Sequence, residues 1–454
     1  MAAPGKDPSG HPPPRIAGKR VLVVGINYWP EPIGIAPYTT AIAEYLAEQG
    51  AKVTVITGVP HYPEWRVPAS HRGRLATRER RNGVDILRLR HSVPHEMTAL
   101  RRAAYEATFL AHATVRGLSQ RPDLVLATTP ALGGAVAAAS VSRRVGAPLT
   151  IVVQDLMALA THQTGIKGGG RMTAATARLE GAALRAASTV AVVTESFIPA
   201  VEAYGVSAER IAVLRNWAHI TPTSLSRNEA RAKLGWPLDQ FLAVYTGNMG
   251  LKQDLGNVVE AARIVARGTV GVVLAGDGSQ RRALETQAEG LSNVRFTGLI
   301  DDELYPVVLA AADVLVVNER ASVGTMSLPS KLTSYLAAGR PIVAAVAEGG
   351  ASERELLRTG GAACTVAPDR PERLAEALAA LAADGPRRDA MSAAGAAYAT
   401  HHLDREESLG TLLALLLRPE HIRLAGSPQA RVASGAGMES GDNARPSVSI
   451  GAGR

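Results

Sequence analysis

The chain has 454 residues, of which 46% are hydrophobic and 20% charged, so it is long enough for two domains and too apolar to be intrinsically disordered. Its net charge of +8 favours anionic ligands or an anionic membrane surface, while an aromatic content of only 4% disfavours nucleic acid. The single cysteine, Cys364, excludes a disulfide framework and a cysteine-based metal site.

Apolar segments alternate with helical patterns along most of the chain. In the first half we expect strands at residues 20–26, 52–57, 84–89, 123–127, 148–153, 189–193 and 211–214. In the second half we expect them at 241–246, 270–275, 294–297, 314–317, 341–345 and 363–366. Runs of Val, Ile, Leu and Ala separated by helices are typical of parallel sheets covered on both faces. Two such series predict an α/β protein with two Rossmann-like, doubly wound domains facing across a cleft.

A polar stretch around residue 220 separates the two series. We expect a tail at 1–17, a first domain at 18–217, a linker at 218–228, a second domain at 229–400, a helix at 401–418 that packs back on the first domain, and a tail at 419–454. Both tails are rich in small, polar and charged residues without apolar periodicity and are predicted to be disordered. No apolar run is long enough to cross a bilayer, and the N-terminus lacks the apolar region of a secretory signal, so we expect a cytoplasmic protein.

Three positions in the first domain follow strand ends. Gly34 lies between the first strand and the next helix, where a missing Cβ lets a phosphate or sugar approach the backbone; an ordinary turn is the equal alternative. Asp155 closes the strand at 148–153, although it could instead cap the next helix. His61 follows the strand at 52–57, and a lone loop histidine is more often structural than catalytic.

Glycine-rich loops with nearby cations follow strands of the second domain. The two loops contain Gly247, Asn248, Gly250 and Lys252, then Gly276, Asp277 and Gly278. Between the strands at 314–317 and 341–345, the run Pro329-Ser330-Lys331 predicts a helix start with free N–H groups, a positive dipole end and an ammonium. Together these segments predict a site for a nucleotide diphosphate.

These motifs together resemble the retaining GT-B glycosyltransferases of family 4, and among them the colanic-acid and exopolysaccharide transferases. The likeness covers about residues 19–417 and rests on segments 28–36, 59–63, 153–156, 214–217, 247–252 and 328–333. It implies transfer of a sugar from a UDP- or GDP-sugar with retention at the anomeric carbon, without a cofactor or a required metal. The implied acceptor is a glycan, a polyprenyl-linked sugar or a small molecule.

In such enzymes the second domain holds the donor and the first domain holds the acceptor. Carried over, Lys252 and Lys331 would neutralise the leaving diphosphate, and Asp155 and His61 would position the acceptor. The donor-binding residues implied by the resemblance are Gly34, Gly247, Asn248, Gly250, Gly276, Asp277, Gly278, Pro329, Ser330, Lys331, Leu332 and Ser334.

One departure concerns a pair of glutamates, eight residues apart, that the wider family carries. Met326 and Ser334 stand at these positions, and the colanic-acid-type branch also has a small polar residue at the second. Glu319 and Glu353 lie nearby but out of register. This departure keeps a catalytically silent homologue, acting as a binding module, among the alternatives. Another alternative is a nucleotide-sugar epimerase of the same shape, which would need a pair of acid/base carboxylates.

Arginines are dense between His71 and Arg102, which predicts either a solvated charged face or docking on an anionic membrane. The arginines concerned are Arg72, Arg74, Arg78, Arg80, Arg81, Arg88, Arg90, Arg101 and Arg102.

Overall fold

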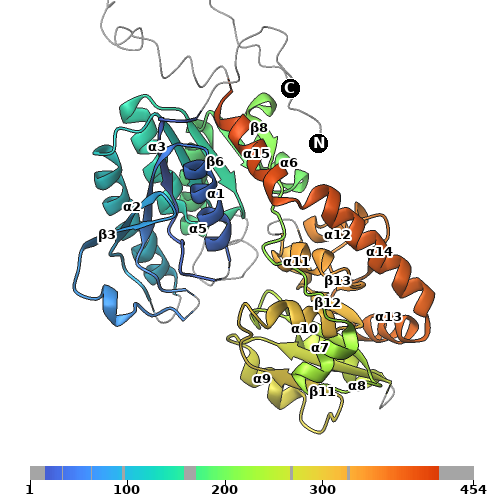
Figure 1. The fold of residues 1–454 in the computed structure, drawn as a ribbon. Helices are drawn as coiled ribbons and strands as arrows, with labels where there is room; N and C mark the ends of the chain where they lie inside the picture. Colours follow the sequence, from blue (N-terminus) through green and yellow to red (C-terminus); the bar gives the residue numbers. More distant parts are fainter. Residues whose placement is uncertain are drawn as a thin grey trace, which may run out of the picture.

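The computed structural model describes residues 16–32, 34–62, 64–94, 98–157, 170–265, 269–324 and 328–418. These residues form two α/β domains, each built on one sheet (Figure 1), so the predicted fold class is confirmed. Nearly all of both predicted tails, residues 1–15 and 419–454, lies outside the described residues. Ile16, which we assigned to the first tail, is instead buried in the core of the first domain, because its side chain is apolar and packs beside the first sheet.

The first sheet has eight strands in the order β3-β4-β2-β1-β5-β6-β7-β8. They are β1 (Arg20–Val24), β2 (Lys52–Gly58), β3 (Ala76–Arg81), β4 (Val84–Leu89), β5 (Leu124–Thr128), β6 (Leu149–Val153), β7 (Thr189–Val192) and β8 (Ile211–Val213). Its helices are α1 (Ala36–Glu48), α2 (Ala99–Leu118), α3 (Leu132–Val145), α5 (Gly170–Ala186) and α6 (Ile198–Ala203). All the strand pairs are parallel except β3 with β4.

Strand β3 was not predicted from the sequence. It is an edge strand with four charged residues, so it lacks the apolar run by which we recognised the other strands. Its arginines lie within the segment that we considered as a docking surface for membranes.

The second sheet has six parallel strands in the order β11-β10-β9-β12-β13-β14. They are β9 (Phe241–Thr246), β10 (Val270–Ala275), β11 (Val294–Thr297), β12 (Val314–Asn318), β13 (Ile342–Ala345) and β14 (Ala363–Val366). The helices are α7 (Arg227–Leu234), α8 (Gly256–Ile264), α9 (Arg281–Gln287), α10 (Tyr305–Ala311), α11 (Lys331–Ala337), α12 (Ala351–Leu357), α13 (Pro371–Ala383) and α14 (Gly385–His402). Helix α7 begins inside the predicted linker 218–228, because Ser226 and Glu229 cap it in a capping box.

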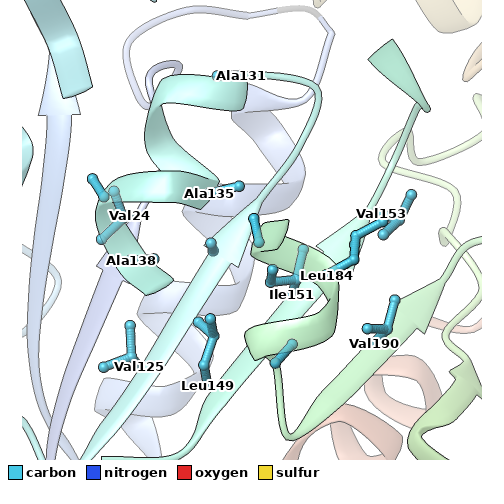
Figure 2. Close-up of a cluster of buried hydrophobic side chains, with 14 of the residues drawn as sticks. Val24, Val125, Ala131, Ala135, Ala138, Leu149, Ile151, Val153, Leu184 and Val190 are labelled. Carbon is cyan, nitrogen blue, oxygen red and sulfur yellow. The ribbon is translucent and has the colours of Figure 1, made fainter. Parts of the chain in front are cut away.

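Small residues let the helices of the first domain lie close to its sheet. Figure 2 shows Ala135 and Ala138 of α3 in a cluster with Leu149 and Ile151 of β6 and Leu184 of α5. All five side chains are almost completely buried. Each side chain removed from water contributes favourable transfer free energy in proportion to its apolar area. This core fixes the strand ends from which the loops of the first domain start.

Helix α15 (Arg405–Leu416) ends the described chain and returns to the first domain (Figure 1). Its Leu409 and Leu412 are fully buried and belong to one cluster with Ile42 of α1 and Val53 of β2. The chain thus passes between the domains twice. The two passages touch, because the backbone N–H of Ala218 donates to the carbonyl of Leu403 at 3.2 Å.

An ion-pair network also connects the domains. Arg215, after β8, pairs with Glu195 of the first domain at 2.6 Å and with Glu355 on α12 of the second at 3.3 Å. Arg358 follows α12 and reaches back to Glu195 at 2.8 Å. The Tyr398 hydroxyl of α14 donates to Glu355 at 2.6 Å. The network therefore supports one relative placement of the two sheets.

The packing of α15 on the first domain predicts that its buried leucines stabilise the fold. We expect Leu412→Ala to lower the free energy of unfolding by roughly 2–5 kcal/mol, because it leaves a cavity in the shared cluster. Urea unfolding followed by circular dichroism would measure this. Thr411→Ala, at an exposed position on the same helix, is the matched control and should have little effect. Equal stability of the two variants would contradict the packing of α15.

Candidate active site

The two glycine-rich loops of the second domain are joined backbone to backbone. The N–H of Gly247 donates to the carbonyl of Ala275 at 2.8 Å, and the N–H of Met249 donates to that of Asp277, also at 2.8 Å. A Cβ on Gly276 would lie 2.0 Å from the Gly247 carbonyl oxygen. The absence of a side chain at Gly276 is therefore required by the contact between the loops, whatever they bind.

Asn248 fills the space between these loops. A Cβ on Gly278 would lie 2.6 Å from its Oδ1, and a Cβ on Gly250 would lie 2.9 Å from its Nδ2. The Asp277 carboxylate is exposed and accepts the Gly278 N–H at 2.7 Å. The predicted donor residues of both loops are thus brought together at the carboxyl edge of the second sheet, since β9 and β10 are adjacent.

Lys331 contributes a cation at the same edge. Its Nζ lies 3.6 Å from the centre of the Tyr245 ring, and a Cβ on Gly247 would lie 3.5 Å from that nitrogen. Helix α11, which Lys331 begins, has only seven residues, and the Ser330 side chain does not cap it. Of the sources of positive charge that the sequence predicted here, the Lys331 ammonium is therefore the one that lies directly beside the Gly247 loop.

Burial lowers the pKa of Lys331 to about 7, although the nearby Glu319 carboxylate opposes this shift. The same desolvation raises the pKa of Glu319 to about 7, which the nearby Ser352 hydroxyl and the charges of Lys331 and Lys252 oppose. Glu319 is almost completely buried at the end of β12. In the sequence, Glu319 is out of register with the pair of glutamates that the wider family carries. Its position directly after a buried strand is the signal that could have identified it.

The end of β12 also positions Lys252. The N–H of Arg320 donates to the Lys252 carbonyl at 2.9 Å, and the Asn318 amide donates to the Gln253 carbonyl at 2.8 Å. Asn257 holds Asn318 in turn, at 2.7 Å. Lys252 and Glu319 therefore belong to one hydrogen-bonded unit, although 67 positions separate them in the sequence (252 to 319).

Two of the other predicted residues around α11, Leu332 and Ser334, lie deeper than Lys331. Pro329 accepts the N–H of Leu332 at 3.0 Å, and Leu332 is buried in the core of the second domain. Ser334 is also fully buried, with its hydroxyl facing Tyr305. Leu332 and Ser334 thus support the helix from inside. Met326, the other departure from the glutamate pair, lies outside the described residues.

Asp155 of the first domain faces the second domain. Burial raises the pKa of its carboxyl to about 7, and the charge of Lys252 opposes this shift. Its backbone carbonyl accepts the Thr129 hydroxyl at 3.0 Å. Beside it, the amides of Gln154 and Asn216 bond to each other at 2.9 and 2.7 Å. The structure therefore brings Asp155 within electrostatic reach of a predicted donor-site lysine.

His61 is enclosed in the first domain, and its side chain has 0% exposure. Its Nδ1 lies 2.9 Å from the Val59 carbonyl, which can only accept, so this nitrogen carries the hydrogen. Its Nε2 lies 3.1 Å from the Tyr105 hydroxyl, and its backbone N–H donates to Glu31 at 2.9 Å. The ring is thus placed to support the surrounding loops.

Gly34, which we expected near the donor phosphates, is exposed on the loop before α1, with φ +73°. A Cβ there would lie 3.5 Å from the Tyr62 ring, which belongs to the same domain. A different residue of this region reaches across: Tyr38 of α1 has its pKa raised to about 12 by burial, despite a hydrogen bond with Thr333 of α11.

The site residues thus belong to a two-domain α/β protein that has partly buried lysines and glycine-rich loops at one sheet edge. Among the described residues, no group of three or more His, Cys, Asp or Glu side chains is placed to hold a metal ion. What such an arrangement does is indicated by comparison with known proteins.

Two family models match this chain. The Glycosyl transferase 4-like domain matches residues 34–217, and Glycosyl transferases group 1 matches residues 240–384. WcaI of Escherichia coli, described as a colanic acid biosynthesis glycosyl transferase, is 30% identical over 332 residues, which is 70% of this chain and 81% of WcaI. The chain belongs to the GT-B glycosyltransferases, in the family that includes this colanic-acid-type protein.

Solved structures share the fold. Sucrose-phosphate synthase from Thermosynechococcus elongatus has a TM-score of 0.69 at 16% identity, and the match covers 87% of this chain and 98% of that one. The HepE protein of Anabaena, in complex with UDP-glucose, has a TM-score of 0.63 at 18% identity, with 87% of this chain and 100% of that one covered.

The pKa of Lys331 can be measured directly. In protein with ¹³C-methylated lysines, the Lys331 signal, identified by its loss in Lys331→Met, should titrate with a pKa of about 7. Glu319→Gln should lower this pKa further, because the Glu319 carboxylate favours the charged ammonium. A Lys331 signal that titrates near the ordinary value of about 10.4 would contradict the burial of the ammonium.

Proposed function

We propose that this protein transfers a sugar from a UDP- or GDP-sugar to a glycan, lipid-linked or small-molecule acceptor, with retention of anomeric configuration, in the synthesis of an exopolysaccharide or cell-surface glycan. The observation that carries the proposal is the meeting of Lys331, Lys252 and the paired glycine loops at one edge of the second sheet. The UDP-glucose complex of HepE, which shares this fold, supports a nucleotide sugar as the donor.

Transfer would depend on electrostatics. As the bond between the anomeric carbon and the phosphate oxygen breaks, positive charge develops on the sugar and negative charge on the diphosphate. The Lys331 and Lys252 ammonium groups would stabilise the departing diphosphate, and preorganised groups of this kind supply several kcal/mol. The acceptor oxygen forms its bond on the same face of the ring, and its proton passes to the leaving phosphate. No cofactor, metal or separate strong base is required by this route.

A second candidate is a nucleotide-sugar epimerase, which needs two acid/base carboxyl groups in the cleft. Asp155 and Glu319 fit that description, because burial raises the pKa of each to about 7 and each is close enough to Lys252 to feel its charge. Incubation with the nucleotide sugar alone separates the candidates. An epimerase releases an isomeric nucleotide sugar, a transferase releases the free nucleotide by slow hydrolysis, and a silent binding module releases neither.

Contact with an anionic membrane surface stays a prediction, as does a cytoplasmic location. No helix within the described part of the chain is long and apolar enough to cross a membrane. Several arginines of the proposed docking segment have internal partners: Arg88 is buried against Glu79, Arg81 pairs with Glu44, and Arg102 pairs with Glu106. Docking would therefore depend on the remaining arginines.

Donor binding should depend on the two lysines. In calorimetric titrations with UDP and GDP, we expect one nucleotide to bind, and Lys331→Ala and Lys252→Ala each to weaken it by roughly 10–100-fold, since a hydrogen bond to a charged group contributes about 1.5–3 kcal/mol. Lys233→Ala removes an exposed lysine on α7 and should leave the affinity unchanged. Absence of binding by every nucleotide tested would contradict the proposal.

The Asp155 carboxyl should shape the pH profile. If its ionised form positions the acceptor, hydrolysis of the nucleotide sugar, with water as the acceptor, should rise with pH through about 7, where this carboxyl loses its proton. Asp155→Asn should lower the rate and remove this acid limb, because the amide does not titrate. Asp239→Asn, at an exposed position, should keep the limb. If the rate of Asp155→Asn still rises with pH through about 7, another group is responsible for that rise.

A further inference from the structure

A cavity of about 340 Å³ opens in the first domain, and its residues have no role in the donor site described above. It is lined by Trp65, Arg66, Val67, Arg72 and Val93. Residues 65–72 follow β2 and Val93 follows β4, and these strands are parallel neighbours in the first sheet. The cavity therefore lies at the carboxyl edge of that sheet, where ligands of doubly wound domains bind.

Trp65 provides a fixed aromatic wall. Its ring centre lies 5.6 Å from that of His61, 5.9 Å from that of Tyr62 and 5.8 Å from that of Tyr105. His61 is itself held on both ring nitrogens, so the indole rests on a rigid support. An indole face presents a flat apolar surface with a polar N–H at its edge, and the C–H face of a sugar ring packs well on such a surface.

Arg66 and Arg72 bring positive charge to the same cavity. Both side chains are exposed and neither has a carboxylate partner among the described residues, and the Nε of Arg72 donates to the Val67 carbonyl at 3.1 Å. Arg81, Arg88 and Arg102, in contrast, all have carboxylate partners. Two guanidinium groups without a neutralising carboxylate at one cavity favour an anion, to which arginine can offer paired N–H donors.

The Tyr62 ring connects the wall of the cavity with the loop that carries Gly34. The Tyr62 ring lies between them, in contact with Trp65 on one side and 3.5 Å from the ideal Cβ position of Gly34 on the other. Glu31, on the Gly34 loop, accepts the N–H groups of His61 and Tyr62, each at 2.9 Å. A molecule in the cavity would thus lie beside the first-domain side of the cleft.

We propose that this cavity binds the acidic group of the sugar acceptor, which is a glycoside carrying a phosphate or a carboxylate. The sugar ring lies against Trp65, and the anion lies between Arg66 and Arg72. This inference rests on the proposed function, because it makes the cavity the acceptor side of a glycosyl transfer. It adds that the acceptor is anionic close to the sugar that receives the transfer.

The test measures binding of small probes by calorimetry, in the presence of a saturating concentration of whichever nucleotide, UDP or GDP, the donor site binds, so that phosphate probes do not enter that site. The probes are glucose 1-phosphate, methyl glucuronoside and neutral methyl glucoside. We expect one or both anionic probes to bind, and the neutral probe to bind at least about tenfold more weakly. Binding of the phosphate alone or of the uronate alone supports the proposal and identifies the acidic group.

Matched variants locate the binding. Arg66→Ala combined with Arg72→Ala should weaken the anionic probe by at least about tenfold. Arg74→Ala combined with Arg78→Ala removes the same charge from exposed positions that do not line the cavity, and should change the affinity by less than about twofold. Trp65→Phe should weaken glucose 1-phosphate more than inorganic phosphate, because only the former has a ring to pack.

Equal losses in the two double variants, or equal binding of neutral and anionic probes, would overturn the proposal. Binding of UDP or GDP without binding of either anionic probe overturns it as well and leaves the proposed donor site unaffected. Arginine-dependent binding of a probe by a protein that binds no nucleotide overturns the proposed function instead, and with it the acceptor role, while the anion site remains.

Discussion

The structure depends on the two adjacent passages of the chain between its domains. One passage leads from β8 to α7 and the other from α14 to α15, and the bond from Ala218 to Leu403 holds them together. Helix α15 completes this constraint, because Leu412 and its neighbours are buried only when the helix lies on the first domain. The ion pairs of Arg215 with Glu195 and Glu355 act at the same junction. The carboxyl edges of the two sheets are thus kept at opposite sides of one cleft, where Asp155 and Lys252 interact.

The same placement explains the unusual protonation behaviour of the site. Lys331, Glu319 and Asp155 are buried enough that desolvation moves the pKa of each to about 7, so none is held firmly in its charged state. Burying such groups is unfavourable unless an opposite charge is near. A diphosphate between the lysines would supply that charge and raise the pKa of Lys331, while it would favour protonation of Glu319. Binding of a diphosphate at this edge would therefore be coupled to proton uptake by electrostatics.

The sequence was sufficient where one physical rule dominates. Apolar runs predicted the buried strands, and a lysine beside Pro329 and Ser330 predicted a cation at the start of α11. The sequence was insufficient for features that depend on tertiary contacts. Strand β3 is polar, so only its pairing with β4 reveals it, and Glu319 faces Lys331 because β12 and α11 meet in space. The glycines at 276 and 278 looked like ligand-binding residues, whereas the structure shows that they also allow two loops to touch.

The arginines of the first domain show why the number of charges in a segment does not identify a membrane-binding surface. The sequence displays one dense basic segment, but the fold divides it, because Arg81, Arg88 and Arg102 neutralise Glu44, Glu79 and Glu106. Arginines paired in this way attract anions from outside less strongly, because a carboxylate already offsets their charge. The attraction that remains belongs to the unpaired guanidinium groups, and Arg66 and Arg72 direct theirs at one cavity with an aromatic wall. Arg72 of the basic segment, together with Arg66 before it, thus lines one localised cavity, which would suit a single anionic group better than a lipid surface.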